Sequence, residues 1–404
     1  MDRRTFLAGT MTSGVIAAAT STLSTNAAAV ELAANGLTKA TIPTPALVVD
    51  LDALDSNIQK MADHCRQSKI GFRPHAKTHK CPAIAQRQMT AGARGICVAT
   101  VPEAEAIAAA GIRGILLCSP IVDAGKIGRM VALASSGANV MLAVGSERQA
   151  KLLAEAAEAS RVDIPVLVDL DVGDRRTGSL PGEPALELAK IIGRSKRLQI
   201  QGVQAYAGHA SHTVGFEKRR ETSRTAMLKA VETKQLLQKA GFDAKILSGG
   251  STGTYNIDSV IDGVTELQVG SYIFMDVDYR RIGGSDGQAI YSDFHASLTL
   301  LTTVVNATHV DRVTVDAGTK AVDTTTANLP QVKNWPGVVY TKAGDEFGAL
   351  TAESGKLPAL GDRLEFIVPH CDPSVNLFDR LYACRGEKVE AIWPVAARRE
   401  YVKT

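Results

Sequence analysis

The ten residues "RPHAKTHKCP", from Arg73 to Pro82, include two lysines, two histidines, an arginine and a cysteine. A solvated basic turn can have this composition, but a lysine amine at the end of a strand can also attack a carbonyl group and bond to it covalently. Lys77 lies three residues beyond Pro74, where its side chain can enter a site, whereas Lys80 lies in a helix-starting turn and is expected to point to solvent. Lys77 is therefore the candidate reactive lysine.

Two later turns combine glycine with hydroxyl side chains and suit a phosphate group. They are "SGGSTGT" at 248–254 and "QVGSY" at 268–272. Glycine lets backbone N–H groups approach an anion closely, and the hydroxyls add further donors. Such turns are weak indicators alone, but these follow the seventh and eighth predicted strands, and phosphate sites recur at that place in barrels. The candidate phosphate-binding residues are Gly250, Ser251, Thr252, Gly270, Ser271 and Tyr272.

A phosphate site facing a reactive lysine predicts pyridoxal 5′-phosphate (PLP). This cofactor needs an amine for its aldehyde, an anchor for its phosphate and groups that tune its ring. Arg176 in "GDRRTG" could pair with the phenolate oxygen of the cofactor, and Tyr206 could contact its ring. Each residue alone is as readily a surface charge or a core tyrosine, so the prediction depends on the combination.

His370 and Asp372 in "IVPHCDPSVNL" are the candidate metal ligands. In an extended segment, residues i and i+2 point the same way, so this imidazole and this carboxylate could share one divalent ion. The plainer interpretation is a polar turn before Pro373. A carboxylate oxygen favours Mn²⁺ or Mg²⁺, with Zn²⁺ as the alternative.

The elements that must position these residues show a regular alternation. Between residues 46 and 285, eight short apolar runs alternate with helix-length stretches, which predicts a (β/α)₈ barrel of the TIM type. An open doubly wound sheet is the alternative, but eight consecutive units favour the barrel. Because the loops after barrel strands meet at one face, Lys77, Arg176, Tyr206 and both phosphate turns should converge there.

After residue 285 the pattern changes to strands joined by turns rich in glycine, proline and aspartate. We predict that residues 30–45 and 286–404 form a mostly antiparallel β domain that carries the metal site. Helical stretches are not expected in it.

Residues 1–29 resemble a bacterial twin-arginine export signal. The twin arginine Arg3-Arg4 precedes a weakly apolar stretch, and Ala27-Ala28-Ala29 forms a small-residue cleavage pattern. The apolar part is too short and polar for a membrane anchor, so we expect a periplasmic protein that is not integrated in a membrane. The six cysteines include no C-x-x-C pair, and several lie in apolar runs, which favours buried free thiols.

The bulk composition restricts the class of partner. The chain has 404 residues, of which 45% are hydrophobic and 22% charged, as in soluble globular proteins. A formal net charge of only +3 and an aromatic content of 5% argue against nucleic-acid binding. A small molecule is the expected partner.

The motifs "RPHAKTHK", "VDLDVGDRRTG", "QAYAGH", "GGSTGT", "ELQVGSYIFMD" and "VPHCDPSVNL" occur in the order found in a known enzyme family. From about Pro43 to near the C-terminus, the sequence resembles the D-threonine aldolase/D-serine dehydratase group, which has the alanine-racemase-like PLP fold. The resemblance implies a homodimer in which Lys77 forms the Schiff base, with Arg176, Tyr206 and the two turns around the cofactor.

The resemblance also implies a reaction. D-threonine and related D-β-hydroxy-α-amino acids would be cleaved to glycine and an aldehyde, with the metal on the β-hydroxyl and His212, or second His209, taking its proton. The H-x-D pair resembles the D-threonine aldolases, whereas relatives that dehydrate D-serine resemble H-x-C. A D-serine or D-threo-3-hydroxyaspartate dehydratase remains the alternative, and an amino-acid racemase would not require the metal pair. Phe347 departs from the histidine that many relatives have there.

Overall fold

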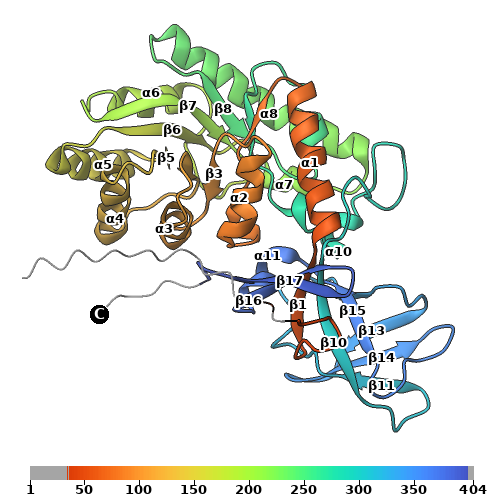
Figure 1. The fold of residues 1–404 in the computed structure, drawn as a ribbon. Helices are drawn as coiled ribbons and strands as arrows, with labels where there is room; N and C mark the ends of the chain where they lie inside the picture. Colours follow the sequence, from red (N-terminus) through yellow and green to blue (C-terminus); the bar gives the residue numbers. More distant parts are fainter. Residues whose placement is uncertain (1–33, 35, 399–404) are drawn as a thin grey trace, which may run out of the picture.

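The computed structural model describes residue 34 and residues 36–398, so the predicted export signal at residues 1–29 lies outside the described residues. Figure 1 shows a barrel of strands surrounded by helices above a second region made mainly of strands. The predicted fold class, a TIM-like barrel with an antiparallel β domain, is confirmed. Within the described residues, no helix is both long and apolar enough to cross a membrane.

The barrel consists of eight parallel strands in the order β2-β9-β8-β7-β6-β5-β4-β3. A parallel bridge between His75, just after β2, and Cys97 in β3 joins the two edges of this curled sheet. Side chains such as Cys97, Leu116 and Leu167 pack together inside it, because alternate residues of a barrel strand point inward. The strands are β2 Gly71–Phe72, β3 Ile96–Val98, β4 Ile115–Leu117, β5 Val140–Val144, β6 Ile164–Leu170, β7 Leu198–Ala205, β8 Ile246–Gly249 and β9 Glu266–Leu267.

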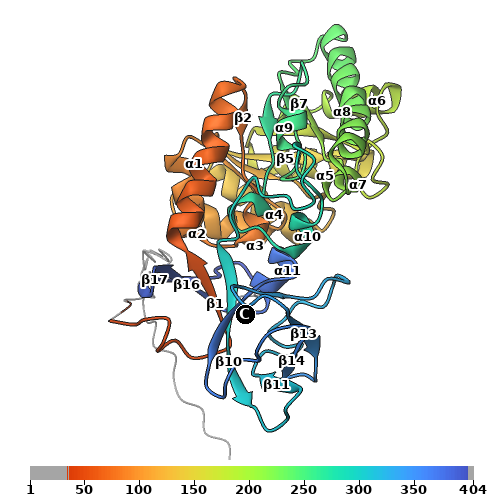
Figure 2. The same cartoon turned by 90° about the vertical axis from the view of Figure 1, so that its right-hand side faces the viewer.

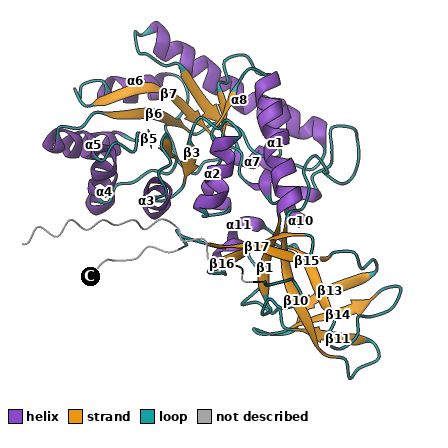
Figure 3. Cartoon of the chain, viewed as in Figure 1, coloured by secondary structure: helices purple, strands orange, loops and turns teal. Residues whose placement is uncertain are grey.

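Amphipathic helices cover the outside of the barrel (Figure 3). In α5, Ser146 caps the N-terminus by accepting a hydrogen bond from Gln149 N–H, and Ala150, Leu153 and Ala157 form the buried face. That spacing of three and four residues places the apolar side chains on one side of a helix. The long helices are α1 Leu51–Gln67, α2 Pro82–Thr90, α3 Val101–Ala109, α4 Ala124–Ser135, α5 Glu147–Ser160, α6 Glu183–Ile192 and α8 Phe216–Lys239.

The second region is a nine-stranded sheet in which β1 lies between β10 and β16. Because β1 pairs antiparallel with β10 and parallel with β16, the predicted start of the barrel at residue 46 is wrong, and the chain enters the barrel only at α1 (Figure 2). The strands are β1 Ala46–Asp50, β10 Leu298–Asn306, β11 Arg312–Val315, β12 Gln331–Val332, β13 Val338–Lys342, β14 Gly348–Ala352, β15 Arg363–Ile367, β16 Arg380–Arg385 and β17 Lys388–Pro394.

Short helical turns connect the two regions at the barrel mouth. The N–H groups of Val277 and Asp278 donate to the carbonyls of Val368 and Pro369, 3.0 and 3.1 Å away. These bonds hold the segment before α11 against α10. The helix α11 itself contradicts the prediction that this region contains only strands. The short elements are η1 Ala76–Thr78, α7 Gly208–Ser211, α9 Tyr255–Asp258, η2 Ser271–Ile273, α10 Val277–Arg280 and α11 Cys371–Asn376.

Candidate active site

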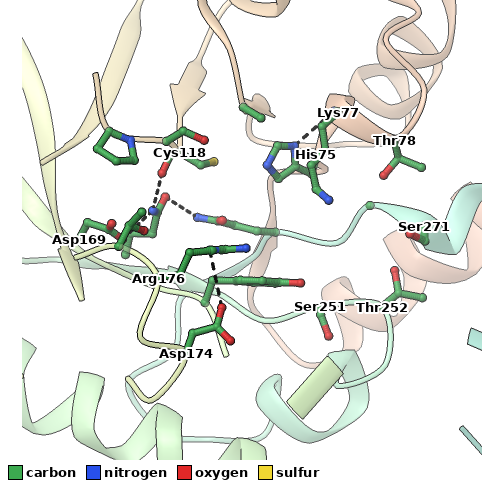
Figure 4. Close-up of a pocket in the computed structure, with 18 of the residues that line it drawn as sticks. His75, Lys77, Thr78, Cys118, Asp169, Asp174, Arg176, Ser251, Thr252 and Ser271 are labelled. Carbon is green, nitrogen blue, oxygen red and sulfur yellow. Dashed lines mark hydrogen bonds and ion pairs between the residues drawn. The ribbon is translucent and has the colours of Figure 1, made fainter. Parts of the chain in front are cut away.

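A cavity of about 330 Å³ opens at the carboxyl ends of the barrel strands. This is the face on which (β/α)₈ barrels carry their active sites, and the volume lies in the range of small-molecule pockets. In Figure 4 the hydroxyl groups of Thr78, Ser251, Thr252 and Ser271 gather on one side of the cavity. Of the residues proposed from the sequence, those lining the cavity are Lys77, Arg176, Tyr206, Ser251, Thr252, Gly270 and Ser271.

Lys77 enters the cavity from η1, directly after the first barrel strand. The Nδ1 atom of His75 caps this turn by accepting from Lys77 N–H at 3.3 Å. The Lys77 amine forms an ion pair with the Asp372 carboxylate of α11. Burial opposes the charge of the amine, but Asp372 outweighs it and raises the pKa of Lys77 above its ordinary value.

Lys80, the competing lysine, has a different environment. Its amine donates to Asn376 Oδ1 at 3.2 Å and lies 3.5 Å from Glu103 Oε1. It is not among the residues that line the cavity. The geometry therefore favours Lys77 as the reactive lysine.

The two predicted phosphate turns lie side by side. Thr252 Oγ1 accepts from the Tyr272 N–H at 2.9 Å, which ties one turn to the other. The Tyr272 side chain, however, points into the core, where its hydroxyl accepts from Gln88 Nε2 at 3.0 Å. Gly250 lies behind the cavity wall with a φ of +76°, a conformation that suits glycine. Tyr272 and Gly250 thus shape the wall without lining it.

Arg176 and Tyr206 pack against each other in the cavity. The guanidinium carbon lies 5.2 Å from the ring centroid of Tyr206, a cation–π distance. Asp174 lies 3.7 Å from Arg176 Nε and accepts from the His209 N–H at 2.9 Å. His209 thus lies behind Asp174 and is not among the lining residues.

His212, the predicted base, also lies outside the lining of the cavity but next to the predicted metal site. Its ring centroid is 6.0 Å from that of His370, and its Nε2 is 3.3 Å from Asp278 Oδ2. Burial lowers the pKa of His212, and the nearby carboxylates of Asp278 and Asp276 oppose this only in part. A neutral imidazole can accept a proton.

The predicted metal pair does not lie in an extended segment. Cys371 begins α11, and only His370, the residue before the helix, has extended dihedrals. The predicted extended geometry, which would point residues 370 and 372 the same way, is therefore wrong. Asp372 pairs with Lys77. His370 Nδ1 lies 2.8 Å from Asp276 Oδ2, which also accepts from the Cys371 N–H. Potential ligand atoms of Asp276, His370 and Cys371 lie within 4.8 Å of one another.

Charge fixes the protonation of this group. Burial opposes the charge of His370, but the hydrogen bond and charge of Asp276 raise its pKa to about 9. Burial would raise the pKa of Asp372, but Lys77 and then His370 hold it well below its usual range. Burial raises the pKa of the Cys371 thiol. To bind here, a metal ion would have to displace a proton from His370 or the Lys77 ammonium from Asp372.

Among the polar residues of the cavity wall that were not predicted from the sequence are Asp169, Gln204 and Gln268. Gln204 Nε2 donates to Asp169 Oδ1 at 2.8 Å, and Gln268 Nε2 donates to Gln204 Oε1 at 3.2 Å. The available signal was a polar residue inside each apolar strand run, "VLVDL", "GVQAY" and "ELQVG". Asp276, the partner of His370, gave no comparable signal.

Residues 49–278 match the alanine racemase N-terminal domain family, and residues 297–384 match the putative serine dehydratase domain. The chain belongs to the alanine-racemase-like family. The two matched segments cover the barrel and most of the β domain. The first match spans all eight barrel strands and every cavity-lining residue except Tyr279.

Proteins similar to this chain in sequence and structure include aldolases and a dehydratase that act on D-hydroxy amino acids. The chain is 35% identical over 365 residues to the 3-hydroxy-D-aspartate aldolase of Paracoccus denitrificans (strain Pd 1222), covering 90% of this chain and 94% of that protein. The D-threonine aldolase structure from Filomicrobium marinum matches with a TM-score of 0.85 and 36% identity over 90% of this chain and 98% of that one. The D-threo-3-hydroxyaspartate dehydratase from Delftia sp. HT23 matches with a TM-score of 0.79 and 28% identity, over 89% and 98%.

These relatives confirm the resemblance to the D-threonine aldolase/D-serine dehydratase group. The chain is a PLP-dependent lyase like D-threonine aldolase. All six cysteines are free, and five of them are buried, as the sequence predicted.

Proposed function

We propose that this lyase cleaves D-threonine and related D-β-hydroxy-α-amino acids to glycine and an aldehyde, with the help of a divalent metal ion. The observation that carries the proposal is the contact between Lys77 and Asp372. It brings a predicted metal ligand of the β domain into contact with the predicted cofactor lysine, which lines the cavity of the barrel.

The cavity fits a phosphate-bearing cofactor. A Cβ atom at Gly270 would lie 2.6 Å from Thr78 Oγ1, so a larger residue would crowd this part of the wall. Ser251 and Thr252 present hydroxyls beside it. When bound, PLP supplies a ring that accepts the electrons of the breaking Cα–Cβ bond. Lys77 can supply the amine only after it has lost its proton, and with it the charge that holds Asp372.

His370 and Asp372 are the proposed ligands of a divalent ion: an imidazole and a carboxylate are common ligands, and Asp276 orients the imidazole from behind. Asp372 would exchange its contact with Lys77 for the ion. A bound ion would supply a Lewis acid for the β-hydroxyl of the substrate. His212, held neutral by burial and lying beside His370, is the proposed acceptor of the hydroxyl proton. Oxygen ligands support Mn²⁺ or Mg²⁺, and the nearby Cys371 thiol keeps Zn²⁺ as the alternative.

The test is to supply the protein with PLP and to incubate it with D-threonine, with and without Mn²⁺, using L-threonine as the control. Glycine and acetaldehyde should form from D-threonine, depend on the metal and disappear in Lys77→Ala. A second readout is the cofactor absorbance near roughly 400–430 nm expected of a lysine-bound cofactor, which Lys77→Ala should lose. Cleavage that is independent of both Lys77 and metal would refute the proposal.

The second candidate is a dehydratase acting on D-serine or D-threo-3-hydroxyaspartate. The thiol of Cys371 lies near His370 and would add a sulfur ligand, which suits zinc, although it holds the middle position of the H-x-D motif and not the cysteine position of H-x-C. The same incubations with these two substrates distinguish the reactions: a 2-oxo acid and ammonia indicate dehydration, whereas glycine and an aldehyde indicate cleavage. Racemisation would leave the carbon skeleton intact.

We also propose that the protein is exported to the periplasm and functions as a homodimer. The twin arginine and the cleavage pattern of residues 1–29 support export, and the resemblance supports the dimer. Fractionation of cells with and without Arg3→Lys/Arg4→Lys tests the first, and light scattering after size-exclusion chromatography tests the second.

A further inference from the structure

A buried carboxylate with no part in the proposed reaction lies behind the phosphate turn. Asp258, the last residue of α9, is 0% exposed. Its Oδ1 accepts from Ser223 Oγ at 2.6 Å, and its Oδ2 contacts Thr254 Oγ1 at 2.5 Å. A Cβ atom at Gly250 would lie 3.0 Å from that Oδ2, so the glycine leaves room for the carboxylate.

A chain of hydroxyl groups connects Asp258 to the cavity. Thr254 Oγ1 accepts from the Ser251 N–H at 3.1 Å and lies 3.1 Å from Ser251 Oγ. Ser251 in turn lines the cavity beside Thr252 (Figure 4). The order from core to cavity is therefore Asp258, Thr254, Ser251.

The protonation of Asp258 sets the direction of every bond in this chain, because a hydroxyl has one proton and two acceptor lone pairs. If Asp258 is ionised, Thr254 must donate to it. Thr254 has then used its own proton and can only accept from the Ser251 hydroxyl. That bond occupies the Ser251 hydroxyl proton, so Ser251 Oγ presents only lone pairs to the cavity. If Asp258 is protonated, it donates to Thr254, Thr254 donates to Ser251 Oγ, and the Ser251 proton is free to point into the cavity.

We propose that Asp258 is a positioning residue that takes up a proton when the cofactor phosphate binds, and so turns the Ser251 hydroxyl toward the phosphate as a donor. The proposal rests on the proposed function only in placing a phosphate at Ser251. The step moves one proton from solvent to Asp258 Oδ2 and breaks no covalent bond.

The electrostatic surroundings agree with this assignment. Burial raises the pKa of Asp258 to about 6, and the hydroxyls of Ser223 and Thr254 oppose the rise only in part. A phosphate dianion nearby favours the neutral acid further. The charged and titratable groups packed around α9 form hydrogen bonds with residues other than Asp258. Arg219 of α8 donates to the Gly253 carbonyl, His64 of α1 contacts Ser259, and Asp293 accepts from Tyr255.

The test measures the dissociation constant of PLP for the apoenzyme between pH 6 and 9 in the wild type and in Asp258→Asn. Asparagine has a permanent donor for Thr254 and an acceptor for Ser223, as the protonated acid has. PLP binding requires ionised Asp258 to take up a proton. The log Kd of the wild type should therefore rise with pH more steeply than that of Asp258→Asn, by up to about one log unit per pH unit above the Asp258 pKa. The second ionisation of the PLP phosphate is common to both proteins and cancels in the comparison.

Three controls separate this role from a structural one. Ser251→Ala should remove the extra slope of log Kd with pH, since no hydroxyl proton remains to be reoriented. This variant also replaces Asp258→Asn as the test if Asp258→Asn does not fold. Asp323→Asn, a buried aspartate of the β domain, should keep the wild-type slope. Pyridoxal, which lacks the phosphate, should bind without the extra proton uptake, measured by calorimetry in two buffers of different ionisation enthalpy.

The outcomes distinguish this inference from the function it rests on. If PLP binds the wild type, Asp258→Asn and Ser251→Ala with the same pH slope, the positioning role is refuted while the cofactor assignment stands. If PLP does not bind the wild type at any pH, the proposed function itself is refuted.

Discussion

At the scale of single residues, the two candidate histidines differ in what surrounds them. His212 lies beside His370 and is held neutral by burial, whereas His209 lies behind Asp174. His212→Asn should lower kcat for D-threonine cleavage by roughly 10²–10⁴-fold, the usual contribution of a general base. The fold loss of kcat in His209→Asn should be at least ten times smaller.

Steady-state kinetics of both variants, with His309→Asn as an exposed control, checks this prediction. Equal losses in His212→Asn and His209→Asn would contradict the assignment of the base. An unchanged kcat in His212→Asn would move the proton transfer to another group.

Asp276 is a second residue whose role follows from its contacts. Its Oδ2 lies 2.8 Å from His370 Nδ1 and accepts from the Cys371 N–H, so it fixes the ring and the first turn of α11 together. Outer carboxylates of this kind typically contribute 10–100-fold to metal affinity. We expect Asp276→Asn to weaken Mn²⁺ binding by about that factor, measured by titration of the protein without substrate. Asp323→Asn should bind Mn²⁺ as the wild type does, and an Mn²⁺ affinity equal in both variants would refute the role.

At the scale of elements, the sequence predicted the barrel strands well and the metal segment poorly. Strands such as Ile164–Leu170 could be predicted because continuous apolar runs bounded by turns are typical of buried parallel strands. Residues 370–376 contain Pro373, which suggested a turn. Proline is tolerated in the first turn of a helix, where its missing N–H has no partner to lose, so α11 forms there. The bond between Asp276 and His370 joins positions 94 apart, which local patterns cannot foresee.

The turn between β9 and η2 carries a prediction of its own. Gly270 has a φ of −119°, which any residue can adopt, so only its contacts restrict it. A methyl group there would lie 2.6 Å from Thr78 Oγ1 and push apart two walls of the phosphate side. Gly270→Ala should therefore weaken PLP binding by at least tenfold, a loss of about 1.4 kcal/mol.

The matched control is Gly128→Ala in α4, where a Cβ atom would meet nothing within 4 Å. It should leave PLP affinity unchanged and stabilise the helix by up to about 1 kcal/mol. Fluorescence titration of the apoenzymes measures both affinities, and equal values would contradict a tight fit at Gly270.

At the scale of the whole molecule, the site exists only because two regions meet. The barrel contributes Lys77 and the phosphate turns, and the β domain contributes His370 and Asp372 at the start of α11. Figures 1 and 2 show α11 next to the barrel. The Lys77–Asp372 ion pair joins the two regions. Asp372 raises the pKa of Lys77, and Lys77 lowers that of Asp372. The cofactor needs the neutral Lys77 amine, and the metal needs the Asp372 carboxylate. Binding of either one therefore requires the Lys77–Asp372 ion pair to separate.

We therefore expect metal and cofactor to assist each other. Mn²⁺ that engages Asp372 removes the charge that holds the Lys77 proton, so the pKa of Lys77 falls and its neutral fraction at pH 7.5 rises about tenfold for each pKa unit. Stopped-flow absorbance should show faster PLP loading of the apoenzyme with Mn²⁺ than without. Asp372→Asn should load quickly without metal and gain nothing from Mn²⁺. Asp379→Asn, which removes an exposed carboxylate paired with Arg398, should behave as the wild type. Loading rates indifferent to both Mn²⁺ and Asp372 would mean that the ion pair does not control the reactive lysine.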